Sequence, residues 1–241
     1  MADIIKIENL SKIFRIGQER VVALKDVSLA IKEGEICCIL GTSGSGKSTL
    51  LNMIAGLEKP TKGRVIIKGN YVINEMNENK LARFRQENIG FVFQSYNLLE
   101  ALTARENVAM PLVFRGASRK TREKRAIQML DNVGLKTHIK HRPTQMSGGQ
   151  QQRVGIARAF VGRPDIVFAD EPTGNLDSKT SREIMELMVN LIKKNNRTMV
   201  MVTHDHELSK YADRVVKISD GEIEEIIIYN EEFFKHEEAK Q

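Results

Sequence analysis

This sequence of 241 residues contains no Trp, few other aromatic residues and only two Cys. Cys37 and Cys38 are adjacent, which places them poorly for a disulfide with each other, and the chain offers no third Cys. A fold held together by disulfides is therefore excluded, and two buried free thiols in a reducing compartment are expected. Apolar residues make up 41% of the chain, enough for the core of one large domain or two small ones.

Long apolar runs are missing as well. Nowhere do about 18 apolar residues follow one another, so we expect no membrane span, and residues 1–4 do not begin a signal peptide. If the protein works at a membrane, another chain must supply the spanning part. The net charge of +6 indicates a solvated basic surface, with phosphate ligands, an anionic membrane face or nucleic acid as alternatives. No run of Lys and Arg forms a nucleic-acid arm, so no nucleic-acid partner is expected.

The apolar pattern changes twice along the chain. Short β-branched or alternating runs predict strands in the first third. From about residue 97 to 161 the pattern is helical, with Ala126, Met129, Leu130 and Val133 on one face. The last third alternates strands with helices, as in a mainly parallel sheet with right-handed crossovers. The predicted strands are residues 4–7, 27–31, 36–40, 63–69, 166–169 and 198–202, and the predicted helices include 47–57 and 184–192.

A glycine-rich segment between a predicted strand and a predicted helix fits G-x-x-x-x-G-K-[ST] at every fixed position. It consists of Gly41, Thr42, Ser43, Gly44, Ser45, Gly46, Lys47 and Ser48. Glycines let backbone N–H groups wrap a triphosphate, Lys47 adds a cation at the β and γ phosphates, and Ser48 offers a hydroxyl to Mg²⁺. The positive end of the following helix points at the phosphates. The segment therefore predicts a nucleotide site.

Two carboxylates end a later apolar strand. Asp170 is well placed to hold Mg²⁺ through its water shell, a weak signal alone and a strong one after a phosphate loop. Glu171 could polarise the attacking water as a general base, with a solvated acid at a strand end as the alternative. No N-K-x-D motif of a GTPase is found. The pair therefore favours ATP hydrolysis.

A second anion site is predicted about 100 residues after the first. Ser147 is a good helix N-cap, and Gly148 and Gly149 expose the first N–H groups of the helix. One chain would not be expected to need two triphosphate clamps. Two chains arranged head to tail could place one clamp on each side of a shared nucleotide. Alone, the motif could be a plain glycine-capped helix.

Together these motifs resemble the nucleotide-binding subunit of ABC transporters over nearly the whole chain. The segment from Ser147 to Gln150 resembles the signature motif of that family, with Met146 where Leu is usual, an exchange of similar apolar volume. The resemblance implies an α/β fold with a P-loop NTPase core, a mainly parallel sheet, an N-terminal antiparallel β subdomain and a helical insertion. It also implies ATP and Mg²⁺ as cofactors and an ATP-dependent head-to-tail dimer with a second copy.

Four further positions match the family. Gln94 resembles the glutamine that touches Mg²⁺ and senses the membrane partner, and Asp177 lies in a segment that resembles the loop crossing the dimer interface. His204 resembles the histidine that contacts the γ-phosphate, and Phe14 the aromatic residue that stacks on adenine, often Tyr in the family. Without the resemblance, these would be ordinary turn, strand-end and core residues.

The resemblance thus assigns a role to each of these residues. Catalysis is assigned to Glu171, His204 and Lys47, and Mg²⁺ binding to Ser48, Gln94 and Asp170. Nucleotide binding is assigned to Phe14, Gly41, Thr42, Ser43, Gly44, Ser45, Gly46, Lys47, Ser48, Thr49, Gln94, Ser147, Gly148, Gly149, Gln150 and Asp177. The remaining histidines His138, His141 and His206 match no role and form no metal-ligand set, so they are interpreted as surface residues.

The expected organisation is one ABC ATPase domain. Residues 1–96 and 163–229 form the nucleotide-binding core, 97–162 the helical subdomain and 230–241 a charged peripheral tail. Residues 93–99 and 170–178 resemble the branch that serves macrolide export, lipoprotein release, peptide-antibiotic export and the cell-division complex. The branch implies a peripheral protein at the cytoplasmic face of the cell membrane, bound to an integral membrane permease.

Two other functions remain open at this point. The first is a soluble ATPase of the same fold in DNA repair or translation, although no long coiled coil lies between Gln94 and Ser147 and only one such domain is present. The second is a regulator or mechanical lever that uses ATP without moving a substrate. The motifs do not choose among substrates.

Overall fold

The computed structural model describes residues 2–229, and the expected peripheral tail at 230–241 lies outside them. The described chain divides into two compact units, one formed by residues up to 77 together with those from 198 onward, the other by residues 78–197. Among residues 2–229, no helix is both long and apolar enough to cross a membrane.

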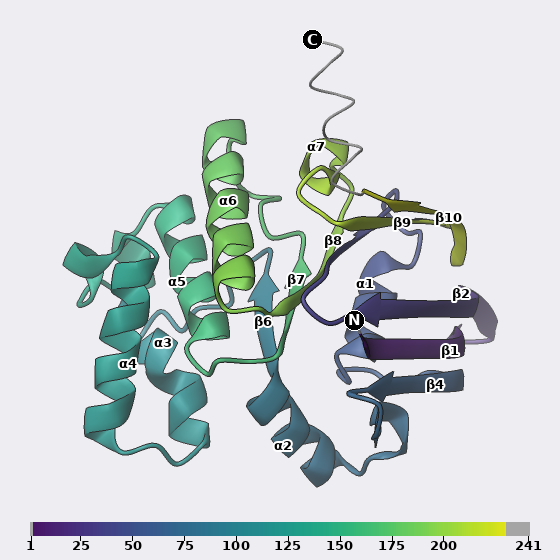
Figure 1. The fold of residues 1–241 in the computed structure, drawn as a ribbon, viewed down its shortest axis with the longest axis horizontal. Helices are drawn as coiled ribbons and strands as arrows, with labels where there is room; N and C mark the ends of the chain where they lie inside the picture. Colours follow the sequence, from purple (N-terminus) through teal and green to yellow (C-terminus); the bar gives the residue numbers. More distant parts are fainter. Residues whose placement is uncertain (1, 230–241) are drawn as a thin grey trace. The chain divides into compact units, whose positions relative to one another are not determined.

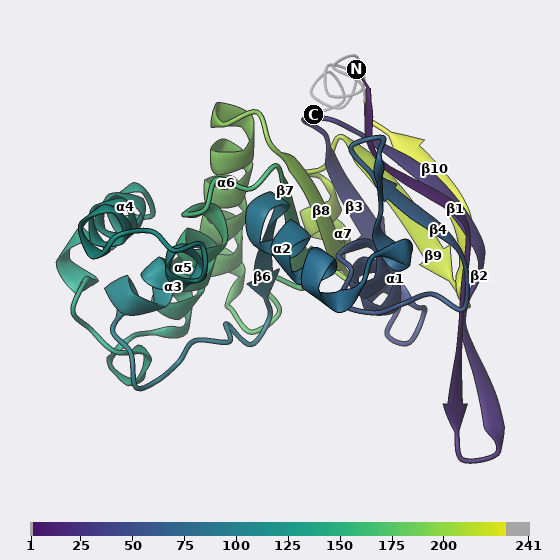
Figure 2. The same cartoon turned by 90° about the horizontal axis from the view of Figure 1, so that it is seen from below.

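The first unit contains a four-stranded antiparallel sheet in the order β2-β1-β4-β5. Its strands are β1 (Asp3–Ile16), β2 (Glu19–Lys32), β4 (Lys62–Ile67) and β5 (Tyr71–Val72). Ile5, Ile7 and Leu10 of β1 are buried. Pairing of β1 with β4 ends at Ser11, whereas pairing with β2 continues to Ile16. Beyond β4 the two strands therefore run on as a ribbon, which Figure 2 shows extending from the sheet.

The same unit contains a mainly parallel set of strands in the order β10-β9-β3-β8. They are β3 (Ile36–Leu40), β8 (Thr198–Thr203), β9 (Arg214–Ser219) and β10 (Glu222–Ile228), with only β10 antiparallel to its neighbour. Every residue of β3 and β8 is buried, as the continuous apolar run of residues 36–40 predicts. Burial raises the pKa of the Cys38 thiol to about 12, and both Cys are free thiols.

Three short helices complete the first unit. They are α1 (Lys47–Ile54), the 3-10 helix η1 (Ile73–Glu75) and α7 (His206–Ser209). The helix α1 was expected to reach residue 57 but ends at Ile54, because Gly56 adopts a positive φ of 66° that a helix cannot continue.

The second unit combines a parallel strand pair with a group of helices. The strands are β6 (Ile89–Phe93) and β7 (Ile166–Asp170). The helices are α2 (Glu78–Asn88), α3 (Ala104–Phe114), α4 (Arg119–Asn132), α5 (Gly148–Phe160), α6 (Ser178–Lys194) and the 3-10 helices η2 (Lys136–His138) and η3 (Pro143–Gln145). Figure 1 shows α3, α4 and α5 packed together, and all three lie within the helical segment expected from residue 97 onward.

Several elements were not predicted from the sequence. The helix α2 is missed because it is mostly charged and polar and buries only Leu81, Phe84 and Asn88, too few residues for a clear apolar period. The pair β9 and β10 was also not predicted, although Val215, Val216 and the run Ile226–Ile228 carry a strand signal. Of the histidines interpreted as surface residues, His206 is exposed, whereas His138 and His141 are half-buried.

Candidate functional site

The glycine-rich loop of the first unit connects β3 to α1. Gly44 and Gly46 have φ values of 82° and 101°, a region that other residues rarely adopt, and Gly46 is the N-cap of α1. A Cβ atom added to Gly41 would lie 2.3 Å from the carbonyl oxygen of Ile218. The pattern of glycines is therefore required by the backbone path itself, and it leaves the N-terminal N–H groups of α1 without a side-chain cap.

The polar side chains of this loop differ in exposure. Lys47 is 5% exposed, and its Nζ donates a hydrogen bond of 2.7 Å to the carbonyl oxygen of Thr42 in the same loop. The Ser45 Oγ is buried without a hydrogen-bond partner among residues 2–229, while Ser48 is exposed. The loop therefore combines a cation, hydroxyl groups and a helix N-terminus, which is the chemistry of a phosphate site.

Phe14 lies on β1 and is half-buried. The Nζ of Lys12 lies 4.9 Å from the centroid of its ring, held there by an ion pair of 2.8 Å with Glu58. Val21, 44% exposed, is directly opposite Phe14 on β2. Since opposite residues of an antiparallel pair share a face, Phe14 and Val21 form one apolar surface on which a planar ring could stack.

His204 directly follows β8 and is exposed. The next residue, Asp205, is the N-cap of α7 and accepts a hydrogen bond of 2.8 Å from the backbone N–H of Glu207. The backbone N–H of Asp205 donates to Thr203 Oγ1 at 3.0 Å. The turn that carries His204 is thus fixed on both sides by short hydrogen bonds.

In the second unit, Asp170 and Glu171 come at the end of β7. Asp170 is half-buried, and the backbone of Glu171 has a φ of 42°. Positive φ is costly for a residue with a long side chain and persists where the surrounding structure imposes it. The carbonyl oxygen of Glu171 accepts from the N–H of Gly174 at 3.1 Å. Backbone strain of this kind clusters at active sites, so the conformation supports a functional role for Glu171.

Gln94 is joined to the loop after β7 by side-chain contacts. The Nδ2 of Asn175 donates to the carbonyl oxygen of Gln94 at 3.1 Å, and Gln94 Nε2 lies 3.5 Å from Asn175 Oδ1. A Cβ atom at Gly174 would lie 2.6 Å from Gln94 Nε2. The structure therefore brings Gln94 together with the 171–177 loop.

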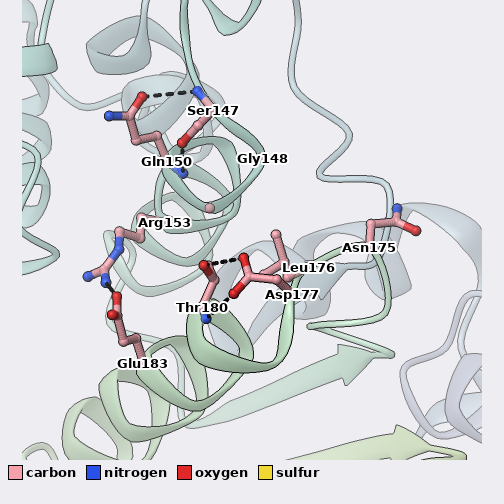
Figure 3. A pocket seen from close by; sticks show the side chains of 10 residues that line it. Ser147, Gly148, Gln150, Arg153, Asn175, Leu176, Asp177, Thr180 and Glu183 are labelled. Atoms are coloured by element: carbon pink, nitrogen blue, oxygen red, sulfur yellow. Dashed lines mark hydrogen bonds and ion pairs between the residues drawn. The ribbon is translucent and has the colours of Figure 1, made fainter.

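The third element is the N-terminus of α5, which lines a hollow of about 390 Å³ in the second unit (Figure 3). Ser147 Oγ accepts from the N–H of Gln150 at 3.3 Å, and Gln150 Oε1 accepts from the N–H of Ser147 at 3.0 Å. This reciprocal pair is a capping box. Ser147 uses only an oxygen lone pair in it, so its hydroxyl proton can still be donated to an anion.

The two glycines of this helix start have close neighbours. A Cβ atom at Gly149 would lie 2.7 Å from Thr180 Cγ2, and one at Gly148 would lie 2.9 Å from Tyr96 Oη. The sequence explains these glycines by the exposure of N–H groups. The structure adds a steric reason, the close packing of α5 against α6 and Tyr96.

Asp177, on the far side of the hollow, is the N-cap of α6. Its Oδ1 accepts from the N–H groups of Lys179 and Thr180, and its Oδ2 accepts from Thr180 Oγ1 at 2.6 Å. The Thr180 hydroxyl in particular holds the pKa of Asp177 below its usual value. The carboxylate is therefore engaged by its own helix.

Sequence reasoning missed Gln152, which is fully buried on α5. Its Nε2 donates to the carbonyl oxygens of Phe93 and Pro172, residues that adjoin Gln94 and Glu171. The available signal was a polar residue on an apolar helix face, since Ile156 and Phe160 follow at spacings of four. Val21 was also missed, because only strand pairing brings it opposite Phe14. Lys12, two residues before Phe14 on the same strand, was missed as well.

No group of three or more His, Cys, Asp or Glu within residues 2–229 is arranged to hold a metal ion. The oxygen donors of Ser48, Asp170 and Gln94 are of the type that Mg²⁺ prefers.

Comparison with known proteins gives consistent matches. Residues 24–174 match the family described as ABC transporter. An uncharacterized ABC transporter ATP-binding protein of Methanocaldococcus jannaschii, MJ0796, is 49% identical over 224 residues, which is 91% of this chain and 95% of the relative. A dimeric structure of MJ0796 in a post-hydrolysis state with ADP and Pi has a TM-score of 0.87 at 46% identity, covering 94% of this chain and 99% of that one.

A longer relative points to the same group. The macrolide export ATP-binding/permease protein MacB of Wolinella succinogenes is 43% identical over 220 residues. The match covers 91% of this chain and 34% of MacB. The expected α/β fold with a P-loop NTPase core, an antiparallel N-terminal sheet and a parallel-rich sheet is confirmed by these neighbours.

Proposed function

Since this chain belongs to the ABC transporter family, we propose that it is an ATPase subunit that acts as a dimer with a membrane permease, and we propose how its residues bind and hydrolyse ATP. The observation that supports the proposal is the presence of two glycine-rich helix N-termini suited to binding anions, the loop before α1 and the capped N-terminus of α5. A head-to-tail dimer uses both, because the α5 N-terminus of one copy meets the γ-phosphate held by the loop of the other.

On the first side of the nucleotide, the N–H groups of residues 41–49 wrap the phosphates and Lys47 leaves Thr42 to contact them. The adenine stacks on the ring of Phe14, beside Val21. Across the dimer interface, Gly148 and Gly149 present backbone N–H groups and Ser147 presents its hydroxyl. Gln150 contributes by holding this helix start in shape through its capping box with Ser147. Asp177 contributes by fixing the loop that faces the partner, through its cap of α6.

Ser48 and Gln94, and Asp170 through water, would hold Mg²⁺, which would neutralise charge on the phosphate oxygens. Glu171 accepts a proton from a water molecule whose oxygen attacks the γ-phosphorus, and the bond to the β-phosphate oxygen breaks to give ADP and phosphate. Lys47 and His204 stabilise the negative charge that spreads over the transferred group. Loss of the γ-phosphate link then opens the dimer.

The permease contact is proposed at a groove of about 270 Å³ in the second unit. Its wall includes Phe93, Met110 and Phe114, and Phe114 is 65% exposed. Phe93 directly precedes Gln94, so an occupant of the groove acts on the residue proposed to contact Mg²⁺. The occupant is a short cytoplasmic segment of the permease that inserts an apolar side chain. The chain accordingly works at the cytoplasmic face of the cell membrane.

The relatives help to choose between transport and the alternative of an ATPase in DNA repair or translation. The relatives cited above are named as ATP-binding or export proteins of ABC transporters, which favours transport over DNA repair or translation. We propose export or a mechanical task within the macrolide-export and lipoprotein-release branch. The division into a core of residues 1–96 and 163–229 and a helical subdomain of 97–162 remains part of the proposal.

The experiment uses Glu171→Gln, which removes the proton acceptor and keeps the size of the side chain. With ATP and Mg²⁺, this variant is expected to retain unhydrolysed ATP and run as a dimer in size-exclusion chromatography with light scattering. The control Lys47→Ala should stay monomeric because it holds the triphosphate poorly. A Glu171→Gln protein that remains monomeric, or that turns over ATP at the parent rate, would contradict the proposal.

A further inference from the structure

His138 has no role in the cycle described above, yet it contacts the signature segment at residues 147–150. Its Nε2 lies 3.2 Å from Nε2 of Gln150, and its Nδ1 lies 3.0 Å from Thr137 Oγ1. The ring is half-buried and lies 5.0 Å from that of His141, between ring centroids. Both contacts are within hydrogen-bond distance, so the proton positions follow from the chemistry of the partners.

The orientation of the Gln150 amide is fixed by its other contact. The N–H of Ser147 can only donate, so the atom that faces it at 3.0 Å must be the amide oxygen of Gln150. The NH₂ group of Gln150 therefore faces His138, and an NH₂ group has no lone pair to offer. His138 Nε2 must accept the bond, which requires a neutral ring with its proton on Nδ1, donated to Thr137 Oγ1.

We propose that His138 is a positioning residue for the signature segment. Neutral His138 holds the amide of Gln150 in the one orientation that caps the N–H of Ser147, and so fixes the N-terminus of α5 as it meets the ATP of the partner copy. This inference rests on the proposed function of that segment. His138 does not touch ATP itself and acts only through Gln150.

The backbone around His138 is well suited to this task. The N–H of His141 donates to the carbonyl oxygen of His138 at 3.0 Å, and the N–H groups of Ala104 and Arg105 donate to the carbonyl oxygens of His141 and Ile139. The first turn of α3 therefore anchors residues 138–141 from outside α5. A hydrogen-bond acceptor on such a fixed support limits the motion of Gln150 more than a mobile side chain would.

His141 packs beside this contact. Its ring centroid lies 5.0 Å from that of His138, and its Nδ1 is buried without a hydrogen-bond partner within residues 2–229.

The test compares three substitutions in the Glu171→Gln background, in which ATP should trap the dimer. His138→Leu removes the acceptor. The ATP concentration for half-maximal dimer formation should then rise about tenfold, because the free energy of one hydrogen bond corresponds to about that factor. His138→Gln supplies a carbonyl oxygen at a similar reach and should stay within about threefold of the parent. Lys136→Ala, in the same 3-10 helix, is the matched control and should have no effect.

Two readouts separate positioning from a general loss of structure. The affinity of monomeric protein for a fluorescent ATP analogue should be the same in all variants, since the loop of residues 41–48 is untouched. In a Gln150→Ala background, His138→Leu should add no further loss, because the contact is already absent.

The inference is overturned if His138→Leu dimerises like the parent, if His138→Gln is no better than His138→Leu, or if the losses from His138→Leu and Gln150→Ala add. Failure of the Glu171→Gln parent itself to dimerise would instead refute the proposed function, and the inference with it.

Discussion

Gln152 donates from its fully buried side-chain Nε2 to the carbonyl oxygen of Phe93 at 3.3 Å. The same Nε2 donates to the carbonyl oxygen of Pro172. Gln152 lies on α5, two residues beyond the capping box of Ser147 and Gln150. One amide group therefore ties α5 to two other segments of the chain. Phe93 directly precedes Gln94, the proposed metal ligand, and Pro172 directly follows Glu171, the proposed general base. A shift of α5 would move both segments together, since each is bound to the same nitrogen.

The first prediction concerns Gln152→Glu. A carboxylate at this position has no N–H to donate, so it would face two carbonyl oxygens that lose their partners. We expect the free energy of unfolding to fall by about 3 kcal/mol or more, against about 1–3 kcal/mol for Gln152→Leu, which introduces no charge. Urea denaturation followed by circular dichroism measures both. Equal stability of the Glu variant and the parent would show that the amide contacts are not formed.

Gly149→Ala is the second prediction. The new Cβ would lie 2.7 Å from Thr180 Cγ2, and we expect a loss of about 1–3 kcal/mol from overpacking. Thr180→Ser removes that methyl group and keeps the hydroxyl that bonds Asp177. The double variant should therefore recover most of the stability lost by Gly149→Ala. If Thr180→Ser gives no recovery, the clash is not the cause of the loss.

The third prediction is a pH effect at the start of α6. The bond from Thr180 Oγ1 is the main reason why the pKa of Asp177 is lowered. A lowered carboxyl pKa stabilises the folded state at pH above the usual aspartate value of about 4, and this contribution disappears as the pH falls through the lowered pKa. Thr180→Val should move the pKa of Asp177 upward, measured by carbon-detected NMR titration. An unchanged titration would mean that the hydroxyl bond does not form in solution.

Phe14 gives the fourth prediction. Phe14→Ala removes the ring on which adenine is proposed to stack, and ATP affinity should fall about tenfold or more, the usual cost of losing one aromatic–base stack. Phe14→Tyr keeps the ring and should bind like the parent. Isothermal titration of the monomer with ATP measures both. A Phe14→Ala protein with parent affinity would mean that the base lies elsewhere.

The sequence by itself identifies the family and most of the residues proposed to bind ATP. The loop of residues 41–48 and the Ser147–Gln150 segment are recognisable because a helix N-terminus that binds an anion is built from consecutive residues. The buried strands β3, β7 and β8 are predictable as well, because each is a run of consecutive apolar residues. The comparisons confirm the ABC transporter family and the ATPase activity. The individual residue roles remain predictions.

Tertiary structure alone decided which side chains support these motifs. Glu58 pairs with Lys12 beside Phe14, Gln152 spans Phe93 and Pro172, and His138 meets Gln150 from a separate turn. Each contact joins residues whose relation depends on the path of the whole unit rather than on local spacing. A hydrogen bond needs its atoms within a few tenths of an ångström of their places, and a linear motif does not carry that information.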